Sequence, residues 1–221
     1  MATAMIWGYA HTLLFMLWLG TDLGVFLARV FIRNPRHSYD ARRRILDRAN
    51  NIQIVPRICF ALILPTGVQM IGAANVYPLT PVIPPAGWTI SALWLIVIFM
   101  RVYTRGRPIA QPLRVLELVF EAFAGLGFVA YGLNSLATGA PIDDPWFATK
   151  LFLFGLVFWT DIAADLCFRS FFAPFAEIGE DGATPEREEA VSRAVNQTLV
   201  AMATLYLLIA AIAYIGAAGP F

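Results

Sequence analysis

Long apolar runs separated by short polar segments dominate the pattern along this chain. A helix needs about 20 residues to cross the hydrocarbon core of a bilayer, because each residue adds about 1.5 Å. Periodicity inside the runs is weak, which is typical of helices that are apolar nearly all round. The pattern therefore predicts an all-α, polytopic bundle of six transmembrane helices in one domain over 1–221. The predicted spans lie at about 5–31, 52–77, 87–103, 113–136, 146–172 and 194–215.

The composition favours burial in lipid over a water-soluble fold. Hydrophobic residues make up 59% of the 221 residues and charged residues 14%, against about 25% charged residues in a typical soluble domain. A soluble protein of this size could not build its polar surface from so few charges. The net charge of +1 provides no long-range field for nucleic acid, and two cysteines cannot form a disulfide framework. We therefore expect the lipid bilayer, and no nucleic acid, as the partner.

Positive charge alternates between the predicted connections. The segment 33–48 holds six arginines, while the connections 78–86 and 137–145 hold neither lysine nor arginine. By the positive-inside rule, the basic connections face the cytoplasm and both termini are extracytoplasmic, in a bacterial inner membrane. We interpret the Arg42–Arg44 run as a topology signal beside lipid headgroups. No basic segment precedes the first run, which predicts a retained helix and no cleaved signal peptide.

The connections also contain local signals. Four prolines in the segment 78–85 predict an extended external strap. Asp144 before Pro145 predicts a capped helix start, and the Thr-Pro-Glu sequence around Pro185 predicts another. The last helix is therefore expected to begin near Pro185, before it enters the membrane. The segment 175–181 is expected to be polar and mobile.

Among the ionisable side chains inside the predicted spans, where an unpaired charge costs several kcal/mol, six are candidates for a cluster. The predicted topology places all of them in the cytoplasmic half. Two pairs of carboxylates are spaced four residues apart, so that each pair shares one helix face. We expect the six to form a cluster of five carboxylates and one arginine: Asp22, Arg57, Glu117, Glu121, Asp161 and Asp165.

Three interpretations of this cluster stay open. In the first, Arg57 pairs with one or two carboxylates and the network only fixes helix packing. In the second, the crowded carboxylates cannot all ionise, and some therefore hold or transfer protons. In the third, the carboxylate oxygens bind a hard cation such as Mg²⁺, Ca²⁺ or Mn²⁺.

The outer half carries one histidine, His11, and the only lysine of the chain, Lys150. The imidazole of His11 either hydrogen-bonds a neighbouring helix or, in its neutral form, ligates haem iron or copper. His37 follows 26 residues later, which is roughly 39 Å along an ideal helix, and lies in the cytoplasmic connection. A second ligand would come from another chain, be absent, or be one of the methionines Met16, Met70 and Met202.

Two short motifs carry a resemblance to a known group of proteins. The first helix contains His11, Trp18 and Gly20 in the pattern H-x6-W-x-G, and the fifth contains W-x3-K-L ending at Lys150-Leu151. The motifs resemble a bacterial membrane superfamily of copper-resistance D (CopD) proteins, HemJ-type protoporphyrinogen oxidases and PuuD-type membrane domains. The resemblance implies that His11 and Trp18 lie at a haem or copper site, with Lys150 near a haem propionate or a substrate carboxylate.

The chain departs from this superfamily in its histidines. The further intramembrane histidines of those families are missing, and Asp161 stands near the place where the fifth helix would carry one. Ligation of haem by two histidines of one chain is therefore excluded.

These observations lead to three functional hypotheses. The leading one is a redox-associated membrane protein that binds haem b or copper near His11 on the outer side, while the inner carboxylates handle protons. The second is a proton- or cation-coupled transporter or channel that uses those carboxylates with Arg57. The third is a non-catalytic subunit of a larger membrane complex, or a homo-oligomer, without a cofactor. No nucleotide-binding motif and no nucleophile beside a base is present, which leaves enzymatic activity undecided.

Overall fold

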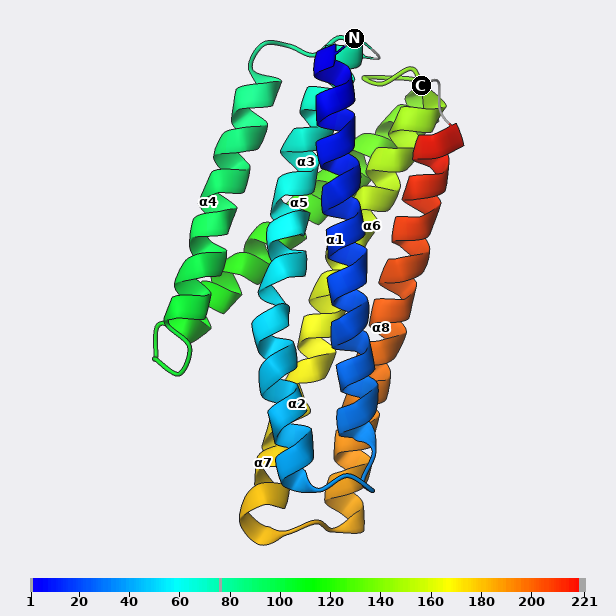
Figure 1. Ribbon diagram of the computed structural model, residues 1–221. Coiled ribbons are helices and arrows are strands. Elements are labelled where there is room, and N and C mark those ends of the chain that lie inside the picture. The colour runs from blue at the N-terminus through cyan, green and yellow to red at the C-terminus, as the bar shows by residue number, and fades with distance from the viewer. Residues whose placement is uncertain (1, 76, 219–221) are drawn as a thin grey trace. The chain divides into compact units, whose positions relative to one another are not determined.

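The computed structural model describes residues 2–75 and 77–218, and in these ranges it contains helices and no strand (Figure 1). The all-α prediction is therefore confirmed for the described residues. The helices are α1 (Ala2–Arg33), α2 (Tyr39–Ile52), α3 (Ile54–Ala74), α4 (Ile83–Tyr103), α5 (Ala110–Thr138), α6 (Pro145–Arg169), α7 (Phe172–Asp181) and α8 (Pro185–Ala218).

Five helical segments of the described chain are long and apolar enough to cross a membrane. They are Ala2–Arg33, Tyr39–Ala74, Ile83–Tyr103, Pro145–Asp181 and Pro185–Ala218. The predicted span at 113–136 lies within the single helix α5, which is not among these five. Its crossing of a membrane stays a prediction, as do the insertion of the other helices and the location of the termini.

The chain divides into two compact units, which are described one at a time. The first runs up to Leu27 and from Asp47 to Glu117, and the second runs from Ala28 to Leu46 and from Leu118 onward. Helices α1, α2 and α5 each contribute residues to both units. The single-domain prediction is neither confirmed nor contradicted by this division.

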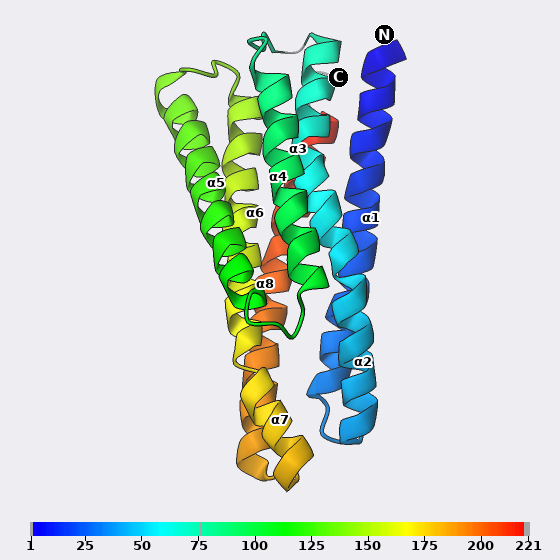
Figure 2. The same ribbon diagram turned by 90° about the vertical axis from the view of Figure 1, so that its left-hand side faces the viewer.

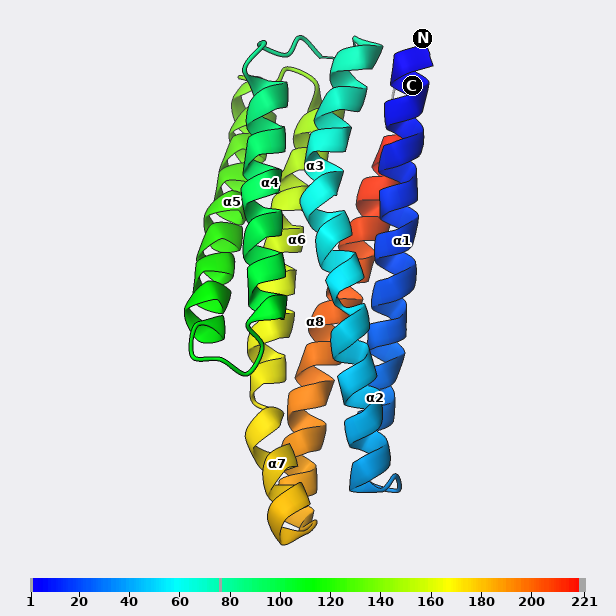
Figure 3. The ribbon, with the colours of Figure 1, turned by 60° about the vertical axis from the view of Figure 1, so that its left-hand side comes forward.

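In the first unit, α3 and α4 lie side by side (Figures 2 and 3). They approach closely where Gly87 of α4 faces Pro65 of α3, because a Cβ atom at Gly87 would lie only 3.8 Å from the Pro65 Cα. An aromatic stack extends this contact to α1. The ring centroids of Trp18 and Phe60 are 4.8 Å apart, and those of Phe60 and Trp94 are 5.1 Å apart. The stack therefore ties three helices around one buried core.

In the second unit, α8 packs along α6 and also contacts α7. Glycines allow the backbones of α5 and α6 to contact each other directly. A Cβ atom at Gly132 would lie 2.6 Å from the backbone nitrogen of Phe152, and one at Gly155 would lie 2.6 Å from that of Val129. Only glycine fits such contacts, which is the small-residue packing expected of apolar helices.

Three segments predicted as connections contain helix, and the structure corrects these predictions. The arginine-rich connection forms α2 from Tyr39 onward. The proline strap ends early because α4 begins at Ile83 with two prolines in its first turn, where a missing N–H costs nothing. The segment expected to be polar and mobile belongs to α7, in which Phe175 and Ile178 are buried. Their three-residue spacing places both side chains on one helix face.

Both predicted helix starts are confirmed. The Asp144 side chain accepts a hydrogen bond of 2.9 Å from the backbone nitrogen of Trp146. The Thr184 hydroxyl accepts one of 3.3 Å from the backbone nitrogen of Arg187, and α8 begins at Pro185. Side-chain caps of this kind satisfy N–H groups that have no partner within the helix.

Candidate functional site

His11 lies in the contact between α1 and α3 in the first unit. A Cβ atom at Gly67 would come within 3.0 Å of the His11 Cε1 atom, so the imidazole packs directly against the α3 backbone. The Nδ1 atom of His11 is 3.2 Å from the Thr66 Oγ1 atom. The histidine is therefore fixed between two helices by a glycine that leaves room for the ring and a hydroxyl that orients it.

The hydroxyl of Thr66 faces the Nδ1 atom of His11 and makes two further contacts. It donates to backbone carbonyls of the preceding turn, at 2.9 Å to Leu62 and 3.0 Å to Ile63. Back-bonding of this kind uses the single hydroxyl proton. This geometry favours the tautomer in which Nδ1 donates to Thr66. Histidines that bind metals use the same arrangement, in which one ring nitrogen donates to a neighbouring group.

The structure separates the three candidate methionines. Met70 lies on α3 one turn from Gly67, and its sulfur would be 3.8 Å from a Cβ atom at Gly8, one turn before His11 on α1. Met16 is 64% exposed. In the second unit, the sulfur of Met202 accepts a 2.7 Å hydrogen bond from the guanidinium of Arg29. Of the three methionines, only Met70 lies in the α1–α3 contact that holds His11.

The other two residues implied by the resemblance have structural partners. Trp18 is 6% exposed and belongs to the aromatic stack of the first unit. Lys150 belongs to the second unit, where its ammonium lies 5.6 Å from the Trp146 ring centroid and 3.1 Å from a Cβ atom built at Gly216. The indole of Trp146 donates to the Ile215 carbonyl. These contacts place Lys150 at the C-terminal end of α8, where a cation stabilises the helix dipole.

In the first unit, one carboxylate joins three helices. Glu117 of α5 is 2% exposed and accepts hydrogen bonds of 2.9 and 3.0 Å from Arg57 of α3. It also accepts a hydrogen bond from Arg101 of α4, a residue outside the predicted cluster. The contact favours the packing interpretation for Arg57 and Glu117. The sequence signal for Arg101 was its position two residues before the end of an apolar run.

The remaining cluster members divide between the two units. Asp22 belongs to the first unit and is half-buried, whereas Glu121, Asp161 and Asp165 belong to the second. In the α5–α6 pair, Gly125 faces Gly155 and Phe158. Continuing this antiparallel register by one turn brings Glu121 to the level of Asp161. Glu121 is only 3% exposed, so its carboxyl group is buried.

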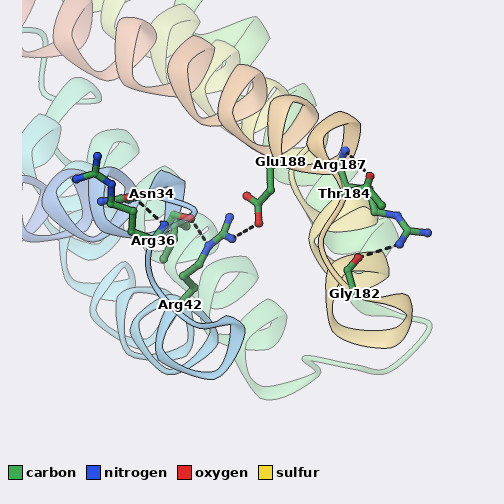
Figure 4. Close-up of polar contacts among 8 residues, drawn as sticks. Asn34, Arg36, Arg42, Gly182, Thr184, Arg187 and Glu188 are labelled. Carbon is green, nitrogen blue, oxygen red and sulfur yellow. Dashed lines mark hydrogen bonds and ion pairs between the residues drawn. The ribbon is translucent and has the colours of Figure 1, made fainter.

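The second unit buries two arginines that were not in the predicted cluster. Arg29 is 5% exposed, and its guanidinium lies 4.4 Å from the Phe168 ring centroid. Arg42 is 1% exposed, which corrects its interpretation as a headgroup-level topology signal. Its Nε atom donates to the Ile32 carbonyl at 2.7 Å, and its Nη1 atom donates to Glu188 at 2.7 Å (Figure 4). Arg42 thus caps the end of α1 and binds the first turns of α8.

Among the described residues, no three or more histidine, cysteine, aspartate or glutamate side chains are grouped so that they could hold a metal ion. A site at His11 would therefore need other donors, such as the Met70 sulfur. Comparisons with protein families, with curated proteins and with solved structures found no significant match. The resemblance to CopD, HemJ and PuuD proteins consequently stays a prediction, and function must be argued from the site.

Proposed function

We propose that this chain is a multi-pass protein of the bacterial inner membrane that holds a redox metal, copper or haem b, through His11. The observation that carries the proposal is the position of His11, whose Nδ1 atom lies 3.2 Å from a Thr66 hydroxyl that also contacts backbone carbonyls. A neutral imidazole, held by a hydrogen bond at one ring nitrogen, is the form in which histidine binds metals through the other. The Met70 sulfur, in the same α1–α3 contact, supplies a second candidate ligand.

The donor set fits copper better than haem. An imidazole and a thioether together suit copper, whose reduced form prefers soft ligands. The same two donors also occur on haem iron in cytochromes. Haem, however, needs room for a macrocycle, and the His11 ring lies against the backbone of Gly67. A single ion needs no such space. When bound, copper would supply one-electron chemistry, while Thr66 and Gly67 hold the imidazole in place.

Purified protein in detergent tests this proposal through its metal content, its absorption spectrum and a titration with Cu⁺. We expect about one copper per chain, and His11→Gln to abolish binding. Met70→Leu is expected to weaken binding by about 10- to 100-fold, because it removes one ligand of a small set. His37→Gln and Met16→Leu are the matched controls, since His37 stacks on Phe31 and Met16 is exposed.

Each outcome bears on the proposal. A Soret band that disappears in His11→Gln would identify haem b as the bound group. Copper that remains bound in His11→Gln would move the site elsewhere and contradict the assignment. Protein that shows neither a Soret band nor stoichiometric copper would overturn the metal-binding function.

A second candidate function, proton- or cation-coupled transport, is favoured by the buried carboxyl of Glu121. It lies at the level of Asp161 in the α5–α6 contact, where Gly125 and Gly155 bring the two backbones together. In vesicles, Glu121→Gln and Asp161→Asn should each abolish flux if this hypothesis holds, whereas Asp143→Asn in an exposed connection should not. Equal flux in all three variants would exclude a transport role for these carboxyls.

A further inference from the structure

The turn between α4 and α5 concentrates positive charge. From Arg101 to Leu116 the sequence holds four arginines and no acidic residue. The turn itself carries Arg105 and Arg107, and both side chains are exposed. This excess of charge belongs to the first unit and lies at the end of one of the apolar helices that are long enough to cross a membrane.

Two contacts hold these exposed arginines in place. The guanidinium of Arg105 donates at 3.0 Å to the Asn51 side chain and at 2.7 Å to the Asn50 carbonyl, both at the end of α2. The guanidinium of Arg107 lies 5.5 Å from the ring centroid of Tyr103. These partners are uncharged, so they orient the guanidinium groups without neutralising them.

Two further arginines, which share the Glu117 carboxylate, also act on this turn. Partial desolvation, followed by the charges of Arg57 and Arg101, holds the pKa of Arg105 below its usual value. Arginine stays protonated at physiological pH regardless, so the shift records mainly the partial desolvation of a charged guanidinium, with a smaller contribution from the two cations. An anion bound beside Arg105 would stabilise this charge.

We propose that the α4–α5 turn binds the phosphate of an anionic phospholipid headgroup, with Arg105 and Arg107 as its main contacts. The planar guanidinium fork matches phosphate oxygens. Basic groups on the cytoplasmic side of membrane helices are known to recognise anionic headgroups. The assignment rests on the membrane insertion that we propose for the chain, and it does not depend on a metal at His11.

The exposed tyrosine at the end of α4 favours a lipid over a free phosphate ion. Tyr103 is the last residue of this apolar helix and is 79% exposed. Tyrosines at such positions lie at the level of the headgroups, with the ring against lipid and the hydroxyl in water. The cation–π contact between Tyr103 and Arg107 therefore places a guanidinium group at headgroup depth.

The test is to measure lipid binding to the full chain in detergent by native mass spectrometry, with phosphatidylglycerol and phosphatidylcholine as probes. We expect the wild-type chain to prefer phosphatidylglycerol, and Arg105→Gln/Arg107→Gln to lose most of this preference. Each arginine removed should weaken phosphatidylglycerol binding about fivefold, and added salt should weaken it further. Arg107→Gln alone leaves the Arg105 contacts to α2 intact and should lose about fivefold by itself.

The control double variant is Arg187→Gln/Arg193→Gln, which removes the same charge from a place where both arginines already pair with carboxylates. An equal loss in the control, or no loss in either α4–α5 variant, would overturn the proposal. Displacement of the lipid by millimolar inorganic phosphate would also overturn it, in favour of a free anion. Reconstitution into phosphatidylcholine vesicles separates the two proposals. If the chain is retained in the vesicles but shows no preference for phosphatidylglycerol, only the headgroup site is refuted. If the chain is not retained in the vesicles, membrane insertion is refuted.

Discussion

The two units bury an arginine–carboxylate contact in different ways. In the first unit, Glu117 is 2% exposed and accepts from two arginines, which are 20% and 22% exposed. In the second unit, Arg42 is 1% exposed and donates to Glu188, which is 16% exposed. The most deeply buried group is therefore the anion in one unit and the cation in the other.

This difference indicates which substitutions each contact should tolerate. Both oxygens of Glu117 have arginine partners. In the second contact, the Arg42 Nη2 and Glu188 Oε2 atoms are buried without a hydrogen-bond partner in the described structure. A satisfied buried network resists change, whereas a partly satisfied one is less stable than a well-packed apolar replacement. The first contact should therefore tolerate no substitution, and the second should tolerate a paired one.

The largest effect is expected from Glu117→Gln. The substitution removes the negative charge that Arg57 and Arg101 contact, which should lower the free energy of unfolding by about 3 kcal/mol. Unfolding in sodium dodecyl sulfate, followed by far-ultraviolet circular dichroism, measures it. Glu189→Gln is the control, because Glu189 pairs with Arg193 in an exposed contact and should change stability by less than about 0.5 kcal/mol. A Glu117→Gln loss as small as that of the control would show that the contact is unimportant.

Substitution of Arg42 should have the next largest effect. Arg42→Met removes charge-assisted hydrogen bonds to Glu188 and to the Ile32 carbonyl, and should cost about 2 kcal/mol. The double variant Arg42→Met/Glu188→Met should recover most of this loss, because a partly satisfied buried pair can be replaced by apolar side chains. The same denaturation assay measures both variants. A double variant as unstable as the single one would contradict the asymmetry between the units.

A glycine pair on α5 tests the close packing of the second unit. Gly132→Ala would place its Cβ atom 2.6 Å from the Phe152 backbone nitrogen, and should cost about 1–2 kcal/mol through overpacking. Gly127→Ala on the same helix meets nothing within 4 Å and should stabilise the helix by about 0.5 kcal/mol. Equal effects of the two substitutions would show that the backbones of α5 and α6 are not in close contact at Gly132.

The sequence predicted much of the fold because long apolar helices have a simple signal. The long apolar runs predicted the helices, and the proline after Asp144 correctly predicted a helix start. Segments outside the apolar runs were harder. α2 was missed because its arginines suggested a solvated connection, although Arg42 points inward to Ile32 and Glu188.

The candidate site could be predicted only in part. His11 was selected by its type and depth, and its role stays a prediction. A pairing of Arg57 with one or two carboxylates was one of three open interpretations, and the structure identifies Glu117 as a partner. Thr66 gave no signal, because a threonine inside an apolar helix usually bonds only its own backbone. Its importance depends on the residue of α1 that faces it. The sequence of one helix does not determine which residues of a neighbouring helix lie opposite.

The smallest effect on stability, and the most specific one, is expected from Thr66→Val. Removal of the hydroxyl deletes the contact with His11 and the back-bond to the carbonyls of the preceding turn. Only the first joins two helices, and its loss should cost about 1 kcal/mol. The substitution also removes the acceptor that holds the proton of His11 on Nδ1. Nitrogen-15 chemical shifts of labelled histidine in metal-free protein should therefore show protonated Nδ1 in the wild type and a shift toward protonated Nε2 in the variant. Thr66→Ser keeps the acceptor and should retain the wild-type shifts. Identical shifts in all three proteins would mean that Thr66 does not orient the ring, whatever metal His11 binds.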